Sequence, residues 1–337
     1  MVQQYKSLVW LVWALLGLLP GCVTGGLDLE VRAISARAPA NVAVYLDVSE
    51  AGEPVEPEAG QLVLYEDGHR LDPSMTRQVL LDKELVVYHH TVLLVDNSGA
   101  TDELVRAELG NAIALFAEEV TPVQPVSVFA YDGSEQLTLV AEFPRIKQAR
   151  RKKLTPPKRL VPKDLSRNLN GAVLLGVKEL ERRLSGSGKP LGVGTLVIFA
   201  AGADLAGRTD SQAVMDWLYE TRHRVLAIGY GEQSHEVEAF GKDGYFDAVS
   251  QDTISLAFEE AGHHVQNHFA RGHLLAYCSP ARSGERSLRI ELQLPGQEGD
   301  RTGAATTQFS AEGFRAGCDP NALPRFNDSS RPSATGP

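Results

Sequence analysis

Three shortages narrow the classes of protein to which this chain of 337 residues can belong. Lysine and arginine number 33 against 43 aspartate and glutamate residues, so the net charge is −10 and a general nucleic-acid partner is not expected. After the first 21 residues, no apolar run is long enough to span a bilayer as a helix. Only three cysteines are present. The 43% of hydrophobic residues is still enough for one large core or two small ones.

Motifs of common catalytic centres are also missing. No serine lies in a nucleophile-elbow pattern, and no glycine-rich loop has the spacing that holds phosphate. Gly229-Tyr230-Gly231 follows a strand-like run but lacks the rest of a dinucleotide fingerprint. We therefore expect a protein that is not an enzyme and that holds no cofactor. A hydrolase or an enzyme accessory subunit is the weakest alternative.

The N-terminus has the features of a secretion signal. Lys6 precedes an apolar stretch from Leu8 to Leu19, which is too short to span a membrane and suits the central region of a signal peptide. The sequence Leu19-Pro20-Gly21-Cys22 resembles a bacterial lipobox, in which the cysteine accepts the lipid. The resemblance implies that Cys22 anchors a soluble protein in the bacterial cell envelope. Because Val23 is not aspartate, the outer membrane is the expected location. The alternative is an ordinary signal peptide with an incidental cysteine.

The other two cysteines, Cys278 and Cys318, remain once Cys22 is assigned to lipid. An exported protein can form disulfides, so an even remainder predicts a bond between the two. Such a bond would close a loop of about 40 residues and contribute roughly 4 kcal/mol in the chain-entropy model. The alternative is a pair of free, buried thiols.

Strand signals concentrate towards both ends of the chain. Val42 to Val48 and Gln61 to Tyr65 are strand-like, and after Gly272 the stretches His273 to Tyr277 and Ser287 to Leu294 are strand-like as well. We expect these two β regions to form a single β-sandwich, into which the middle of the chain is inserted. The alternative is two separate small β elements.

The middle of the chain alternates strands with helices. A run of apolar or β-branched residues from Thr91 to Val95 ends at Asp96, and a polar turn and a helical pattern follow. Further strand-like runs, separated by helical patterns, are residues 126–130, 195–199 and 224–228. This alternation predicts an α/β fold with a doubly wound, mostly parallel sheet covered on both faces. Asp132-Gly133 predicts a hairpin turn into one more strand.

Three loops of this region resemble the von Willebrand factor A (VWA) family. The first reads Asp96-x-Ser98-x-Ala100, against Asp-x-Ser-x-Ser in the family. The second contains Arg167 where the family has threonine, and the third contains Ala201 where the family has aspartate. The resemblance implies the α/β fold described above, with these loops at the carboxyl ends of the strands. In the family the loops hold a divalent cation, and here three of the five ligand positions are changed.

The changed ligands make loss of the metal the favoured interpretation. A hard divalent cation needs several oxygen ligands, and an arginine nearby repels it. Arg167 could instead pair with Asp96 and replace the charge of the metal. Alternatively, Arg167 points to solvent and Asp96 only caps the following helix. Asp204 is a less favoured replacement ligand for an atypical Mg²⁺ or Ca²⁺ site.

A basic segment precedes the second loop. Residues 145–163 contain nine lysines and arginines and no acid, and the prolines in the second half of the segment favour an extended loop. It could bind an acidic protein, a polyanionic glycan or lipid headgroups, or it could be a solvated insertion. Its candidate binding residues are Arg150, Arg151, Lys152, Lys153, Lys158 and Arg159.

Histidines form a second cluster, near the end of the last helix of this region. His264 and His268 are four residues apart, a spacing that can chelate zinc. No carboxylate partner is apparent in the sequence, so an exposed polar helix face is the favoured interpretation.

The sequence thus predicts a lipid-anchored envelope protein that binds an envelope or surface protein without a metal, as a scaffold or adhesion module. A metal-dependent adhesin is the alternative. The predicted divisions of the chain are a signal peptide (1–21), a tether (22–27), the first part of the sandwich (28–90), the VWA domain (91–270), the second part of the sandwich (271–320) and a disordered tail (321–337).

Overall fold

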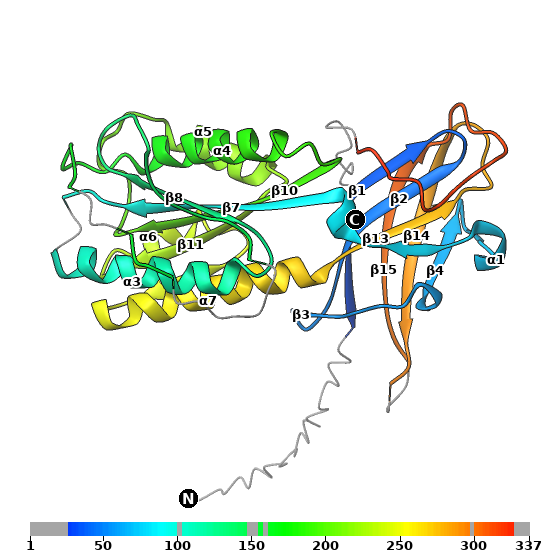
Figure 1. Cartoon of the computed structure of the whole chain (residues 1–337), viewed down its shortest axis with the longest axis horizontal. Helices are drawn as coiled ribbons and strands as arrows, with labels where there is room; N and C mark the ends of the chain where they lie inside the picture. The colour runs from blue at the N-terminus through cyan, green and yellow to red at the C-terminus, as the bar shows by residue number, and fades with distance from the viewer. Residues whose placement is uncertain (1–25, 100–102, 147–153, 158–160, 297–299, 327–337) are drawn as a thin grey trace, which may run out of the picture.

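The computed structural model describes residues 26–99, 103–146, 154–157, 161–296 and 300–326, which form two lobes (Figure 1). One lobe is a β-sandwich built from both ends of the described chain, and the other is an α/β domain built from the residues between them. In Figure 1 the α/β domain lies on the left and the sandwich on the right. The insertion of one fold into the other, predicted from the sequence, is present.

The sandwich consists of two antiparallel sheets that each combine early and late strands. The first has the order β1-β2-β13-β6, with β3 paired to β2. It contains β1 (Leu27–Arg37), β2 (Asn41–Glu50), β3 (Glu53–Pro54), β6 (Val79–Leu81) and β13 (Gly272–Cys278). The second has the order β15-β14-β4-β5. It contains β4 (Leu62–Glu66), β5 (His69–Arg70), β14 (Glu285–Leu294) and β15 (Arg301–Ser310).

The core of the sandwich follows from alternation along its strands. Side chains of a strand point to opposite faces in turn, so every second residue can face the other sheet. The buried residues that do so include Val42, Val44, Leu46, Leu288, Ile290 and Leu292. Two short helical elements connect strands of this lobe, η1 (Ala59–Gln61) and α1 (Pro73–Thr76), and a third, α2 (Lys83–Val86), leads from it into the α/β domain.

The α/β domain is built on one six-stranded sheet of order β12-β11-β10-β7-β8-β9. Its strands are β7 (Val87–Asp96), β8 (Val126–Tyr131), β9 (Thr138–Phe143), β10 (Leu191–Ala200), β11 (Arg224–Tyr230) and β12 (Tyr245–Ala248). All neighbours pair in parallel except β8 and β9, which form the hairpin predicted at Asp132-Gly133. The doubly wound, mostly parallel sheet is therefore as predicted.

Helices cover both faces of this sheet. They are α3 (Glu103–Val120), α4 (Leu169–Ser185), α5 (Ser211–Glu220), α6 (His235–Glu238) and α7 (Gln251–Arg271). α3 and α7 pack on one face around Phe116 and Phe258, and α4 and α5 pack on the other around Leu180 and Leu218. Because both faces are covered, the central strands carry continuous apolar runs, such as residues 92–95 of β7 and 196–200 of β10. No helix in the described ranges is long and apolar enough to cross a membrane.

The two lobes are joined without a linker. α7 ends at Arg271, and β13 begins with the next residue. α2 likewise leads directly into β7 at Val87. The predicted boundary at residue 91 is four residues late, because residues 87–90 already pair with residues 191–194 of β10. Val86, Val87, Leu191 and Leu274 pack together at this junction.

Two histidines of α7, His264 and His268, do not lie on an exposed face, whereas His263 is exposed. His268 is buried, and its ring centroid lies 4.3 Å from that of the partly buried His264. The Nε2 atom of His264 lies 2.8 Å from the carbonyl oxygen of Asp243. His268 also lines a cavity of about 420 Å³ between the lobes. The predicted exposed face is therefore wrong for these two histidines, because the segment around Asp243 packs on His264 and the junction between the lobes covers His268.

Both predicted end segments differ from expectation where the structure describes them. Leu27, assigned to the tether, is the first residue of β1. Residues 321–326, assigned to a disordered tail, run beside β1, where the Ser35 hydroxyl donates a 2.7 Å hydrogen bond to the carbonyl oxygen of Arg325. Pro324 is buried there. Residues 1–25, including Cys22, and residues 327–337 lie outside the described part of the chain.

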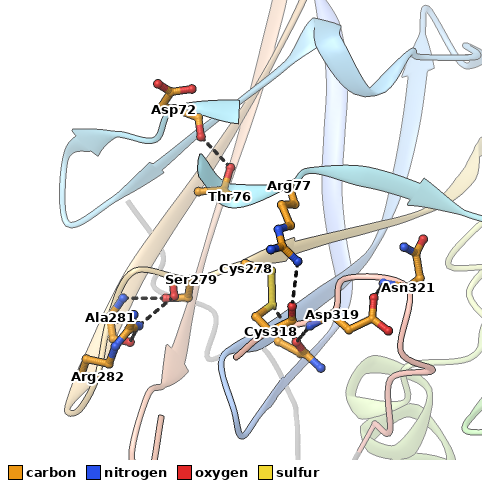
Figure 2. Close-up of a disulfide and its surroundings, with 11 residues drawn as sticks. Asp72, Thr76, Arg77, Cys278, Ser279, Ala281, Arg282, Cys318, Asp319 and Asn321 are labelled. Atoms are coloured by element: carbon orange, nitrogen blue, oxygen red, sulfur yellow. Dashed lines mark hydrogen bonds between the residues drawn. A yellow bond between two sulfur atoms is a disulfide. The ribbon is translucent and has the colours of Figure 1, made fainter. Parts of the chain in front are cut away.

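Cys278 and Cys318 form the predicted disulfide (Figure 2). The bond links the end of β13 to the segment after β15, which are 40 positions apart in the sequence. Arg77 donates a 3.2 Å hydrogen bond to the carbonyl oxygen of Cys318 and attaches the same segment to the region after α1. The segment that follows β15 is thus attached to the late strand β13 through the disulfide and to the early part of the sandwich through Arg77.

Candidate functional site

The three family-like loops meet where the sheet changes its direction of winding. From β7 the chain crosses through α3 to β8 on one side, and from β10 it crosses through α5 to β11 on the other side. β7 and β10 are neighbours in the sheet, and the loops that follow them run to helices on opposite faces. In open α/β sheets ligands bind outside the carboxyl ends of the strands at this switch point. Asp96 ends β7, and Ala201 directly follows β10.

Asp96 is fully buried at this point, and both of its carboxylate oxygens accept hydrogen bonds. Oδ1 accepts a bond of 2.8 Å from the backbone N–H of Ser98. Oδ2 accepts one of 2.7 Å from Nε of Arg167 and one of 3.2 Å from the backbone N–H of Ala201. One carboxylate thus connects all three loops.

Arg167 supplies the positive charge at the centre of the loops. Only 1% of its surface is exposed, although arginine is seldom fully buried. Besides its bond to Asp96, its guanidinium donates a 2.8 Å hydrogen bond to the carbonyl oxygen of Ala203. Its own carbonyl oxygen accepts bonds from the backbone N–H groups of Leu205 and Ala206. Of the two alternatives drawn from the sequence, the structure contains the ion pair.

The remaining loop residues differ in their roles. Asp204 does not face Asp96: its Oδ2 accepts from the backbone N–H of Asn170, at 3.0 Å, and its Oδ1 from that of Gly207, at 2.8 Å. Ala201 contributes its backbone N–H, which a comparison of side chains could not reveal. The hydroxyl of Ser98 is buried and has no hydrogen-bond partner among the described residues. Ala100 lies outside those residues.

The donor set does not fit a divalent cation. A cation at Asp96 needs several converging oxygens, including carboxylates. Among the residues that the structure describes, Asp96 is the one carboxylate at the centre, and a guanidinium occupies one of its oxygens at 2.7 Å. Both oxygens of Asp204 are used by backbone N–H groups. In the described part of these loops, Ser98 adds one buried hydroxyl without a hydrogen-bond partner, and this hydroxyl beside a carboxylate already paired with arginine supplies too few ligands for such an ion.

Two residues beside the ion pair have shifted pKa values. Burial, and then the Asp96 carboxylate, raise the pKa of Tyr131 well above its usual value, so its hydroxyl stays protonated and donates a 3.1 Å hydrogen bond to the carbonyl oxygen of Phe199. Burial alone would raise the pKa of Asp132, but hydrogen bonds from Ser134, Lys163 and Asp164 outweigh it and lower that pKa. Asp132 therefore stays charged and fixes the loop that leads to Arg167.

The surface above the ion pair carries apolar side chains. Leu165 is 70% exposed and Leu205 is 64% exposed. Leu165 lies against Gly99, where a Cβ atom would come within 2.8 Å of the leucine Cβ, and its carbonyl oxygen accepts the N–H of Gly99. Leu205 follows Asp204 and donates its N–H to Arg167. We call Leu165 and Leu205 the apolar rim.

The apolar rim is not among the residues predicted from the sequence. A signal was present, since each residue is an isolated large apolar side chain in a loop otherwise made of polar, small or proline residues. The predicted basic residues Arg150, Arg151, Lys152, Lys153, Lys158 and Arg159 all lie outside the described part of the chain. Of the same segment, the structure shows Arg145 paired with Glu84 at 2.6 Å.

The sheet order, the helices on both faces and the three loops that meet at Asp96 define a doubly wound α/β domain with its candidate site at the switch point of the sheet. Solved structures similar to the chain include VWA proteins. The ArnB paralog VWA2 from Sulfolobus acidocaldarius is 12% identical with a TM-score of 0.42, and the similarity covers 86% of this chain and 76% of that one. A von Willebrand factor type A protein from Catenulispora acidiphila is 11% identical with a TM-score of 0.43, and the similarity covers 84% of this chain and 73% of that one.

A third similar structure is the manganese-loaded TRAP protein of Plasmodium vivax, which is 13% identical with a TM-score of 0.37. The similarity covers 74% of this chain and 98% of that one. No model of a known protein family matches the sequence, and no curated protein matches it. The strand order and the loops, rather than these low identities, define the fold.

Proposed function

We propose that the protein is a binding module, not an enzyme, and that it captures a protein partner at the carboxyl edge of the α/β domain without a metal ion. The observation that carries the proposal is the apolar rim around the buried Asp96–Arg167 pair. Exposed leucines can exclude water from an apolar patch of a partner. The buried ion pair already fixes the loops that carry them, so binding costs little conformational entropy in these loops. The partner is an envelope or surface protein that presents an apolar patch.

The chemistry of the centre supports this mode of binding. A metal-dependent adhesin would use a cation to coordinate an acidic residue of its partner, but here the guanidinium of Arg167 already holds the carboxylate of Asp96. Because Arg167 is buried, it cannot reach the partner. Binding energy would therefore come from apolar contacts around the pair, which typically contribute about 25 cal/mol per Å² of buried surface.

Replacing Leu165 and Leu205 together by glutamate is expected to abolish capture of the partner from a cell-envelope extract. Two charges placed on exposed positions leave the fold intact but oppose burial of the rim. The measurement is a pull-down with immobilised protein. The matched control is Met75→Glu, which places a charge at an equally exposed position, 78%, on the sandwich lobe.

The same pull-down is run with EDTA and with added Mg²⁺ or Ca²⁺. A partner retained in EDTA and lost with the double variant supports the proposal. A partner lost in EDTA and restored by Mg²⁺ contradicts it and favours the metal-dependent adhesin. Equal loss with Met75→Glu would show that the rim has no special role.

We further propose that Cys22 carries a lipid that attaches this module to a membrane of the bacterial cell envelope, with the outer membrane as the expected location. The lipobox-like sequence at residues 19–22 supports it. Cys22→Ala is expected to move the protein from the membrane fraction to the soluble fraction, because the single acyl anchoring site is removed. Unchanged membrane association of this variant would refute the lipid anchor at Cys22, and a wild-type protein found in the soluble fraction would favour the ordinary signal peptide.

A further inference from the structure

A second group of potential ligands lies far from Asp96, between α3 and α7. These two helices lie side by side on one face of the sheet (Figure 1). Glu119 belongs to the last turn of α3, and Glu259 and His263 are four residues apart on α7. One ligand atom from each of these residues lies within 4.8 Å of the other two. Residues four apart share one face of a helix, so Glu259 and His263 face Glu119 together.

We propose that Glu119, Glu259 and His263 form a binding site for a zinc ion that links α3 to α7. Imidazole nitrogen and carboxylate oxygen are both ligands of zinc, at about 2.0–2.2 Å. In a tetrahedral site such bonds place neighbouring ligand atoms about 3.3–3.5 Å apart. The Nδ1 atom of His263 and the Oε2 atom of Glu119 are 3.4 Å apart, which matches that spacing. The third ligand needs only a side-chain rotation on a partly exposed surface.

The charges around the three residues favour a cation. Two carboxylates face a histidine, and in the described part of the chain neither pairs with a lysine or an arginine. Glu119 also stands at the carboxyl end of α3, whose last turn contains no basic residue. The helix dipole disfavours an acid at that end. A bound cation would neutralise both carboxylates and the end of the dipole at once.

The backbone of α7 is shaped to admit Glu119. Gly262 lies inside the helix next to His263. Glycine in a helix interior lowers stability by about 1 kcal/mol relative to alanine. A Cβ atom at this position would come within 2.9 Å of the Glu119 Cβ. Gln266, one turn further on, donates to the backbone carbonyl of Glu119 and lies 3.5 Å from its carboxylate. The glycine and the glutamine thus hold Glu119 across α7, in front of His263.

The site lies at the opposite end of α3 from the loops at Asp96, so it is independent of the proposed partner surface. Its three protein ligands leave one tetrahedral position for water. The ligand chemistry separates it from an Mg²⁺ or Ca²⁺ site, because those ions take oxygen ligands and gain little from an imidazole. Zinc bound here would fix α3 to the helix that continues into the sandwich.

The test is calorimetric titration of Zn²⁺ into the purified, tag-free chain after removal of metals with a chelator. We expect one site with a Kd on the order of 1 μM. Glu259→Gln and His263→Ala are each expected to weaken binding at least about tenfold. Glu260→Gln, an exposed neighbour on the same helix, is the matched control and should leave the Kd unchanged.

The melting temperature provides a second readout. Zinc should raise it for the wild-type chain and for Glu260→Gln, but not for Glu259→Gln, because only a ligand that binds the native state stabilises it. Absence of zinc binding to the wild-type chain overturns the proposal. Binding that survives both ligand substitutions also overturns it, since the ion would then be held elsewhere. Displacement of zinc by equimolar Mg²⁺ would overturn the assignment of an imidazole ligand.

Discussion

Replacing Arg167 by methionine is expected to lower the free energy of unfolding by about 3–5 kcal/mol, because it leaves a buried carboxylate without its partner. Asp96 is fully buried and, among the described residues, would keep only the two backbone N–H donors of Ser98 and Ala201. Chemical denaturation monitored by circular dichroism measures the change. Asp96→Asn should also be destabilising, since it leaves the guanidinium of Arg167 unpaired.

The double variant Asp96→Asn/Arg167→Met distinguishes a buried ion pair from two independent effects. Removing both charges leaves none uncompensated, so the double variant should be more stable than the sum of the two single changes predicts, by roughly 2–3 kcal/mol. Additive losses would contradict the coupling. Arg208→Met is a suitable control, because Arg208 pairs with Asp164 at the surface and exposed pairs contribute about 0–1 kcal/mol.

Acidification from pH 7.5 to pH 5.0 is expected to remove about 6 kcal/mol of stability through three buried histidines together, each contributing about 2 kcal/mol. Burial, assisted by the positive charge of Lys83, lowers the pKa of His89 to about 3. Burial, assisted by Arg183, lowers the pKa of His90 to about 4. Burial, assisted by Arg222, lowers the pKa of His223 to about 4.

The direction of the pH effect follows from proton binding. In the unfolded chain a histidine has a pKa of about 6.5, so between pH 6.5 and pH 4 the unfolded state binds more protons than the folded state. The stability is therefore fully present above pH 6.5 and is lost as the pH falls towards the folded pKa. Urea denaturation at a series of pH values measures this slope.

A single-histidine variant tests the assignment. His223→Gln should reduce the difference in unfolding free energy between pH 7.5 and pH 5.0 by about 2 kcal/mol, whatever its effect at pH 7.5. His69→Gln, at an exposed position of β5, should leave the difference unchanged. If both variants had the same slope as the wild-type chain, the acid lability would have to come from other groups.

The central strands and the insertion of the α/β domain could be predicted because burial on both faces leaves a strong signal. β10 is continuously buried from residue 194 to residue 200, and its apolar run is plain in the sequence. β12 was missed, because only one of its four residues is fully buried. The first half of β15, at residues 301–305, contains no large apolar residue and was missed for the same reason.

The centre of the candidate site was only partly predictable. Arg167 could be aligned with a loop, and its charge suggested Asp96 as a partner. The hydrogen bond from the backbone of Ala201 and the commitment of Asp204 to backbone N–H groups depend on loop conformation, which side-chain identity does not specify. The burial of His268 depends on the other lobe, since the sandwich covers a helix face whose sequence is polar enough to be exposed.

The insertion of the α/β domain also determines the order in which the chain can fold. β2 pairs with β13, so the central pairing of the first sandwich sheet joins residues 41–47 to residues 272–278. A ribosome releases the whole α/β sequence before it releases β13, and closing so long an unstructured loop is slow. If the α/β domain forms first, its own packing brings Val87 and Gly272 to the same junction and shortens the effective loop. The sandwich, although it begins first in the sequence, is then the last part of the protein to be completed during synthesis.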